Sequence, residues 1–88
     1  MGHILAKMKG VKLQDIKRAL ESDALNHAKQ GLFLEHLWQN DDDKNEILFL
    51  FRTKDLKYAK KFIEKVHIDA LKENPRANLP NMTFLEEK

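Results

Sequence analysis

The stretch from Gly31 to Arg52, GLFLEHLWQNDDDKNEILFLFR, constrains the fold of this chain more than any other segment. Two apolar runs flank a polar cluster of asparagine, aspartate and lysine at positions 40–45. Turn-forming residues between two runs of strand-forming residues predict a β-hairpin. A hairpin on a solvated surface is apolar on one face only, but both strands of this one are apolar on both faces. Both faces of the predicted hairpin therefore need to be covered.

A regular series of elements surrounds the hairpin. The predicted elements are a strand at 3–9, a helix at 12–30, strands at 32–39 and 46–53, a helix at 54–74, a loop at 76–81 and a strand at 82–87. Gly31 is placed to end the first helix, and Asn74-Pro75 to end the second, because the residue before proline avoids the helical region. Thr53 or Asp55 is expected to cap the second helix.

Apolar residues recur at three- and four-residue spacing in both helical segments, as an amphipathic helix requires. The stripe of the first helix is Leu13, Ile16, Leu20 and Ala24. The stripe of the second is Leu56, Ala59, Ile63, Val66 and Ala70, with Phe62 alongside. Ser22-Asp23 leaves open a kink within the first helix.

The order β-α-β-β-α-β predicts an α+β fold, the ferredoxin-like sandwich. Its four-stranded antiparallel sheet carries both helices on one face, and residues 1–88 form a single domain. We expect the first and third strands to lie at the centre, parallel to each other, with right-handed crossovers. The strand at 46–53 suits a central position because it contains the longest apolar run.

The hairpin register decides which residues share a face. Pairing Trp38 with Ile47 is favoured because it sets polar Gln39 opposite polar Glu46. One face then holds Leu34, His36, Trp38, Ile47, Phe49 and Phe51, and we assign this face to the helices. The other holds Phe33, Glu35, Leu37, Gln39, Glu46, Leu48, Leu50 and Arg52. A register shifted by one residue is the alternative, and it would exchange the faces of one strand relative to the other.

Two helices can cover only one face of this sheet, so the other face needs a partner. The simplest partner is the same face of a second copy, and we predict a homodimer through the open sheet face. A domain of 88 residues has a marginal core, which such a partner surface would help to stabilise. The alternative is a monomer with a curled sheet.

Composition narrows the class of protein. The chain has no cysteine, which fits a reducing, cytoplasmic location, and we expect no signal peptide or membrane span. A net charge of +2 on a mixed surface argues against nucleic-acid binding. The lysines at 54, 57, 61 and 65 are interrupted by acids, as on a solvated helix face. Phe49 and Phe51 have the spacing of RNA-stacking aromatics, but the basic-Gly-aromatic pattern of such domains is missing.

Candidate chemistry concentrates on histidine. His36, among Leu34, Trp38 and Phe49 on the predicted helix-side face, is the candidate general base, and these three neighbours are candidate ligand-pocket residues. His27, near the buried edge of the first helix, is a further pocket candidate. A histidine at the rim of the core, with no chemical role, is the alternative for His36. No metal site or cofactor is predicted, because the four histidines lack ligand spacing and the aspartates at 41–43 suit a turn.

Several segments together match the pattern of one superfamily. They are Leu20, Gly31-Leu32, Asp42-Asp43-Lys44-Asn45-Glu46, Ala59, Phe62 and the ending PNMTFLE at 80–86. On these residues the chain resembles the dimeric α+β barrel superfamily, and most of all its small cyclase-like and antibiotic-biosynthesis-monooxygenase-like proteins. Lys44 replaces the expected proline, Ile16 a frequent tryptophan, and His27 is nearest to a common arginine that is missing. The resemblance covers nearly the whole chain.

The resemblance implies a dimer with a cavity between each sheet and its own helices. It implies no single reaction, because the superfamily includes oxygenases, isomerases and haem enzymes. Three hypotheses follow for this chain. It is a cofactor-independent monooxygenase-, isomerase- or cyclase-like enzyme for a small apolar or aromatic molecule, a non-catalytic small-ligand-binding dimer, or a protein-interaction module.

Overall fold

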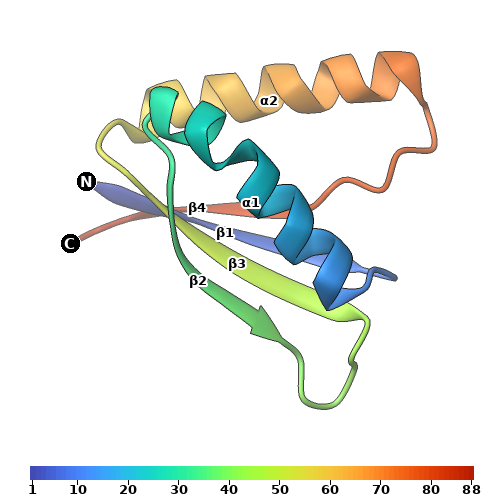
Figure 1. Cartoon of the computed structure of the whole chain (residues 1–88). Helices are drawn as coiled ribbons and strands as arrows, with labels where there is room; N and C mark the ends of the chain where they lie inside the picture. Colours follow the sequence, from blue (N-terminus) through green and yellow to red (C-terminus); the bar gives the residue numbers. More distant parts are fainter.

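A computed structural model describes residues 1–88 of the chain. The elements are β1 (Gly2–Lys9), α1 (Leu13–Lys29), β2 (Phe33–Gln39), β3 (Glu46–Thr53), α2 (Leu56–Glu73) and β4 (Asn81–Glu86) (Figure 1). They form one four-stranded sheet in the order β2-β3-β1-β4, and every neighbouring pair is antiparallel. This βαββαβ arrangement confirms the predicted ferredoxin-like α+β fold.

The central strands β1 and β3 are antiparallel to each other, so the prediction that they run parallel was wrong. The crossover through α1 makes β1 parallel to β2, and β3 lies between them in the sheet. Because β3 returns from β2 through a hairpin, it must run against both of its neighbours.

The helix ends follow from local chemistry. Gly31 adopts φ 75°, the left-handed conformation that ends α1 and that side-chain-bearing residues avoid. The Asp55 carboxylate accepts a hydrogen bond from the Tyr58 backbone N–H at 3.0 Å and thereby caps α2. The helix α1 continues through Ser22-Asp23 as a single element. Neither helix has the length and apolar character needed to cross a membrane.

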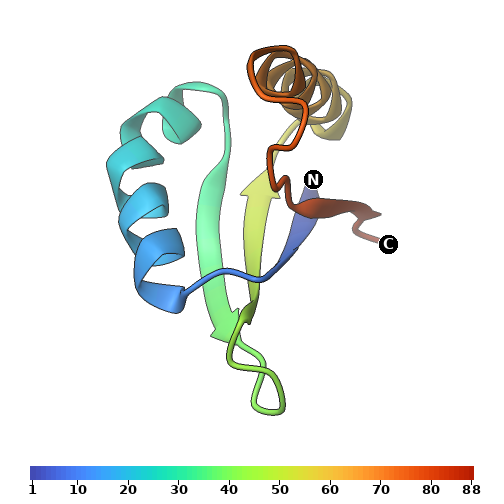
Figure 2. The same ribbon diagram turned by 90° about the vertical axis from the view of Figure 1, so that its right-hand side faces the viewer.

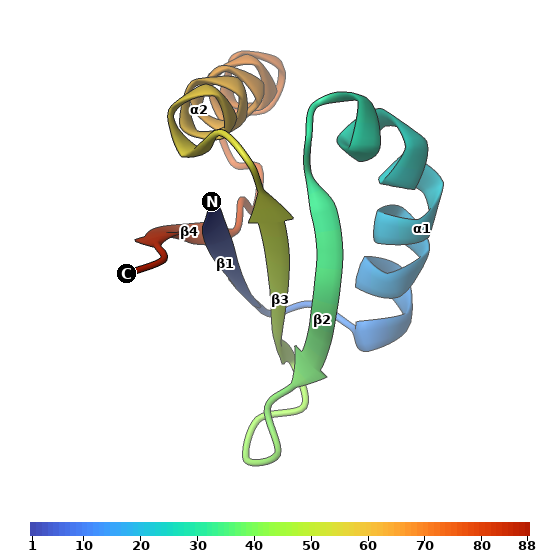
Figure 3. The same cartoon turned by 90° about the vertical axis from the view of Figure 1, so that its left-hand side faces the viewer.

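Both helices pack on one face of the sheet, with α1 along β2 and α2 over the other side (Figures 2 and 3). The core between the helices and the sheet consists of Ile4, Ala6, Leu20, Leu32, Ile47, Phe49, Phe51, Ala59 and Ile63. Ile47, Phe49 and Phe51 therefore face the helices, as their alternation on β3 predicts. Val66 departs from the predicted buried stripe of α2, because 46% of its surface is exposed.

A β-bulge in β2 changes which residues share a face. Leu34 pairs with Phe51, the register then shifts at Glu35, and Trp38 pairs with Leu48. The predicted pairing of Trp38 with Ile47 was thus wrong by one residue. Side chains alternate along a strand, so the extra residue at the bulge exchanges the faces of every residue beyond it.

The bulge leaves part of the predicted face assignment intact and reverses the rest. Phe33 and Leu34, before the bulge, lie on the predicted faces. Beyond the bulge Leu37 turns toward the helices and packs against the core. His36 and Trp38 turn to the open face, where they lie beside Leu50 and Leu48.

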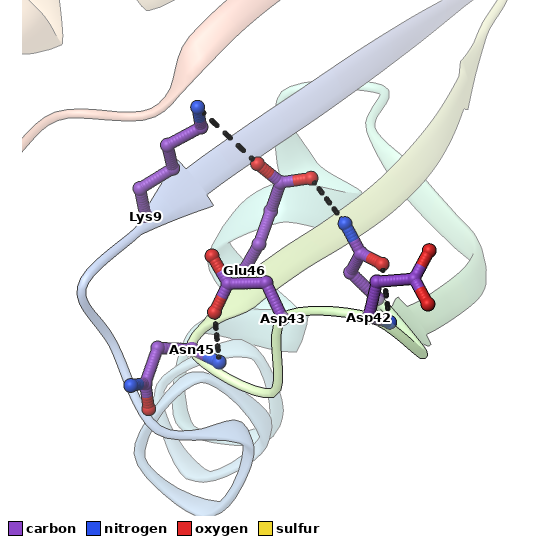
Figure 4. A network of polar contacts seen from close by, with 6 residues as sticks. Lys9, Asp42, Asp43, Asn45 and Glu46 are labelled. Atoms are coloured by element: carbon purple, nitrogen blue, oxygen red, sulfur yellow. Dashed lines mark hydrogen bonds and ion pairs between the residues drawn. The ribbon is translucent and has the colours of Figure 1, made fainter.

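The hairpin turn explains why this register forms. Asn40 rather than Gln39 is the polar partner of Glu46: its backbone N–H donates to the Glu46 carbonyl at 2.9 Å, and its side-chain amide donates to the Glu46 carboxylate at 2.9 Å. Asp43 accepts from the backbone N–H of Asn45 at 3.0 Å (Figure 4). The aspartates therefore act as turn residues, as the sequence predicts.

Candidate functional site

A cleft of about 240 Å³ lies between the two helices on the covered face of the sheet. Four elements contribute to it, namely α1, β3, α2 and β4, together with the segments that precede β2 and β4. Its lining residues are Leu20, Asp23, Asn26, His27, Leu32, Phe49, Phe51, Phe62, Ile63, Val66, His67, Pro80 and Met82. A concave site with mostly apolar walls and a few polar groups is the usual form of a small-molecule site.

Aromatic rings of the central strand form the floor of the cleft. The rings of Phe49 and Phe51 meet edge to face, with centroids 5.8 Å apart and planes at 88°. Both side chains are buried, and both lie on β3, which is hydrogen-bonded on each side. The floor is therefore rigid, and it offers ring surfaces to an apolar or aromatic ligand.

Polar groups gather on the two helices. Asp23, Asn26 and His27 come from α1, and His67 comes from α2. Burial lowers the pKa of His67 below its ordinary value of 6.5, because the charged imidazolium is disfavoured away from water. His67 is therefore a neutral imidazole at neutral pH, able to accept a proton or a hydrogen bond.

His27 occupies a different environment within the same cleft. Its ring packs edge-on against Phe51, with centroids 5.2 Å apart and planes at 76°. It is half-buried, and its side chain makes no hydrogen bond to any other residue of the chain. The two histidines thus present polar ring atoms to one apolar cleft from two different helices.

The sequence-predicted site residues separate into two groups. His27 and Phe49 line the cleft, and Leu34 lines a neighbouring hollow under α1. His36 and Trp38 lie on the opposite, open face, exposed and stacked on each other with ring centroids 5.1 Å apart. The expectation that these two share a cavity with Phe49 was wrong, because the bulge at Glu35 reverses their direction.

The cleft contains polar residues that sequence reasoning did not select. His67 is not among the candidates that the sequence indicates, and Asp23 appears there only as part of a possible kink in the first helix. One signal was available for His67: it follows Val66, a member of the predicted buried stripe, and so lies near the edge of the covered face of α2. That His67 and His27 would meet at one cleft depends on how the two helices are placed, which periodicity does not specify.

The open face carries a polar network at one end and apolar residues at its centre. Glu35 lies 3.0 Å from His3 Nε2 and 3.5 Å from Arg52 Nε, so it joins β2 to β3 and β1. The Arg52 guanidinium also lies 5.1 Å from the centre of the Phe33 ring. The central row of this face runs from His36 through Leu50 and Leu5 to Thr83. No three His, Asp or Glu side chains on either face cluster as metal ligands would.

The chain matches no family model, and no curated protein matches it significantly. Among solved structures, the fold is similar to that of an uncharacterized NIPSNAP domain protein from Burkholderia xenovorans. The two share 18% sequence identity at a TM-score of 0.59, over 100% of this chain and 95% of that one. At this level of identity the likeness shows the ferredoxin-like fold alone.

Proposed function

We propose that this chain binds a small apolar or aromatic molecule in the helix-side cleft, and does so as a homodimer formed through the open sheet face. The observation that carries the ligand proposal is the composition of the cleft. Eight of its 13 lining residues are hydrophobic, with two phenylalanines as the floor and two histidines on the helices. An engineered cavity of about 150 Å³ holds benzene, so this cleft fits a molecule of one or two rings.

Binding is tested with 1-naphthol, a neutral two-ring molecule, by titration calorimetry. The blocking variant is Val66→Trp, because Val66 lines the cleft but is half exposed, so a larger side chain there enters the cleft without disrupting the core. The matched control is Ile68→Trp on the same helix, where the side chain is 54% exposed and lines no pocket. We expect Val66→Trp to weaken binding at least about tenfold, a loss of about 1.4 kcal/mol, and Ile68→Trp to leave it unchanged. Equal affinity in all three proteins would contradict the proposal.

The dimer proposal rests on the apolar centre of the open face. Leu5, Leu48 and Leu50 lie on the inner strands of this face, and Trp38 and Leu85 are exposed on its outer strands. Only 11 of the 88 residues are buried in the single chain, which is a small core for a stable domain. A second copy would bring the same twisted apolar surface, suited to sheet-on-sheet packing about 10 Å apart. Light scattering after size exclusion at tens of micromolar tests this, and a monomer mass would refute it.

A second candidate function is a cofactor-independent enzyme acting on the same class of molecule. The observation that favours it is His67, a neutral imidazole held beside apolar walls. Such a group is suited to general-base catalysis, taking a proton from a bound aromatic molecule. Sequence reasoning gave this role to His36, but the cleft offers His67 and His27 instead.

The enzyme candidate is tested with 5-nitrobenzisoxazole, a two-ring probe of base strength. A base removes the C–H proton of the isoxazole ring, and the C–H electron pair becomes the third C–N bond of a nitrile. The N–O bond breaks, and its electron pair stays on the phenolate oxygen. We expect the protein to exceed free imidazole in rate per histidine, and His67→Gln to abolish the excess while 1-naphthol still binds. A rate no higher than that of imidazole would leave ligand binding as the function.

A further inference from the structure

A second hollow lies under α1 on the side of β2. It measures about 290 Å³ and is lined mainly by apolar side chains of α1, β2 and β3. Ala24 and Ala28 stand one turn apart on α1, and Leu34 stands on β2. Residues four apart share one face of a helix, so two alanines here leave the space between α1 and the edge strand unfilled.

The second hollow and the helix-side cleft share a wall. Leu20, His27, Leu32 and Phe51 line both of them. The two spaces are thus neighbours, and the residues between them include the edge-on contact of His27 with Phe51.

Of the two rings in that contact, only His27 is free to move. Phe51 is 4% exposed on a central strand, with Leu34 and Ile4 as its cross-strand neighbours. His27 is half-buried on a helix, and no hydrogen bond holds its ring. A helical side chain of this length has two common χ1 positions, so the imidazole can swing without a change in the backbone.

We infer that the cleft and the hollow form one elongated site for a neutral molecule with an apolar chain and a single polar head. The His27 ring is the movable partition between its two compartments. The inference rests on the proposed ligand-binding function and extends it from a compact ligand to an elongated one. The apolar chain of the ligand occupies the hollow between Ala24, Ala28 and Leu34. The polar head of the ligand lies in the cleft beside Asn26 and His67. The head is uncharged, because the mostly apolar walls of the cleft disfavour any group with a charge and the Asp23 carboxylate would in addition repel an anion.

The test compares 1-hexanol with 1-decanol, which carry the same head on a short and a long chain. Each newly buried methylene strengthens binding about fourfold, so a chain that continues past His27 gains affinity with length. We expect 1-decanol to bind the unmodified protein at least about fiftyfold more tightly than 1-hexanol, measured by titration calorimetry.

Two variants test where the alkyl chain of 1-decanol lies. Ala24→Phe fills the second hollow from an exposed position on α1, and Ala19→Phe is the matched control because Ala19 is exposed on the same helix and lines no hollow. We expect Ala24→Phe to weaken the binding of 1-decanol at least about tenfold and to leave the affinity for 1-hexanol unchanged. Ala19→Phe should change neither affinity. Removing the partition with His27→Ala is expected to speed 1-decanol association and leave its affinity at least as high.

The outcomes separate the inference from the function on which it rests. If neither alcohol nor 1-naphthol binds, the ligand-binding function fails and the elongated site fails with it. If 1-hexanol binds but 1-decanol gains less than about fourfold, the cleft is a site and the hollow is not part of it. Loss of both alcohols in Ala24→Phe, with the fold intact by circular dichroism, would also overturn the separate second compartment.

Discussion

The two faces of the central strand β3 are built from similar residues but meet different surroundings. Ile47, Phe49 and Phe51 point to the helices and are buried, whereas Leu48 and Leu50, between them, point to the open face and remain partly exposed. On the covered face the helices leave a cleft lined by two histidines. On the open face His36, which pairs with Leu50, is exposed and stacks on Trp38. Hydrophobic residues alternate onto both faces of β3, and only the cover by the helices decides which of them are buried and line a cleft.

The largest effect is expected from a charge at the centre of the open face. Leu50 lies between His36 and Leu5 on the open face. Arg52 of β3 and Lys7 of β1 lie on the same face. In a symmetric dimer Leu50→Arg places new positive charges at the centre of the interface, and juxtaposed like charges cost several kcal/mol. We expect the dimer dissociation constant to rise at least about a hundredfold, measured by sedimentation equilibrium. Lys57→Arg, on exposed α2, is the control, and an unchanged mass for Leu50→Arg would exclude this face as the interface.

A pair of neighbouring truncations compares the two faces directly. Ile47→Ala removes a fully buried side chain from the covered face, and we expect it to lower the free energy of unfolding by about 2–5 kcal/mol. Leu48→Ala, one residue along on the open face, should cost about 1 kcal/mol or less in the single chain, because its side chain is only partly buried. Urea unfolding at concentrations low enough to populate the monomer measures both. Equal losses would show that the open face is as well packed as the covered one.

His67 on the covered face should make the free energy of unfolding depend on pH just below neutrality. The folded pKa of His67 lies below its ordinary value of 6.5, so between these two values the unfolded chain binds more protons than the folded one. Stability therefore falls as the pH is lowered from about 6.5 through the folded pKa, and it is flat with respect to this group above that window. His67→Gln should reduce the slope of the free energy of unfolding against pH below about pH 6.5, measured by urea unfolding. As the control, the free energies of unfolding of the two proteins should change with pH in parallel above about pH 7.5. The same slope against pH in both proteins below 6.5 would contradict the burial of His67.

The smallest effect is expected from Glu46 on the open face, whose carboxyl group changes stability in acid. The hydrogen bond from the Asn40 side chain holds the pKa of Glu46 below its ordinary value of 4.5. The positive charges of Lys7 and Lys9 act in the same direction, and the ion pair of Lys9 with Glu46 is seen in Figure 4. A depressed carboxyl pKa contributes stability above the unfolded value, and that contribution is lost as the pH falls through the folded pKa. Asn40→Ala should raise the midpoint of acid unfolding by a small amount, followed by circular dichroism. Gln39→Ala, which removes only a side-chain hydrogen bond to the Lys44 carbonyl, should leave the midpoint where it is.

The cleft itself was only partly predictable from the sequence. Phe49 and His27 both line the cleft, and helical and strand periodicity places them on the covered faces of their elements. The sequence does not indicate that His67 lines the same cleft as His27, because the two residues lie on different helices, 40 positions apart along the chain. His36 and Trp38 were assigned to the wrong side because an alternating pattern carries no information about a bulge.

The sequence by itself determined the order of the elements, the antiparallel hairpin with its aspartate turn, and the burial of Ile47, Phe49 and Phe51. These features depend on local propensity and on periodicity, both of which are properties of short segments. Only the tertiary structure decided the direction of His36 and Trp38, the position of His27 and His67 at one cleft, and the small core that leaves one face of the sheet open. Those outcomes depend on the register in which the strands pair and on the spacing between the helices. Both are fixed by contacts between residues far apart in the chain.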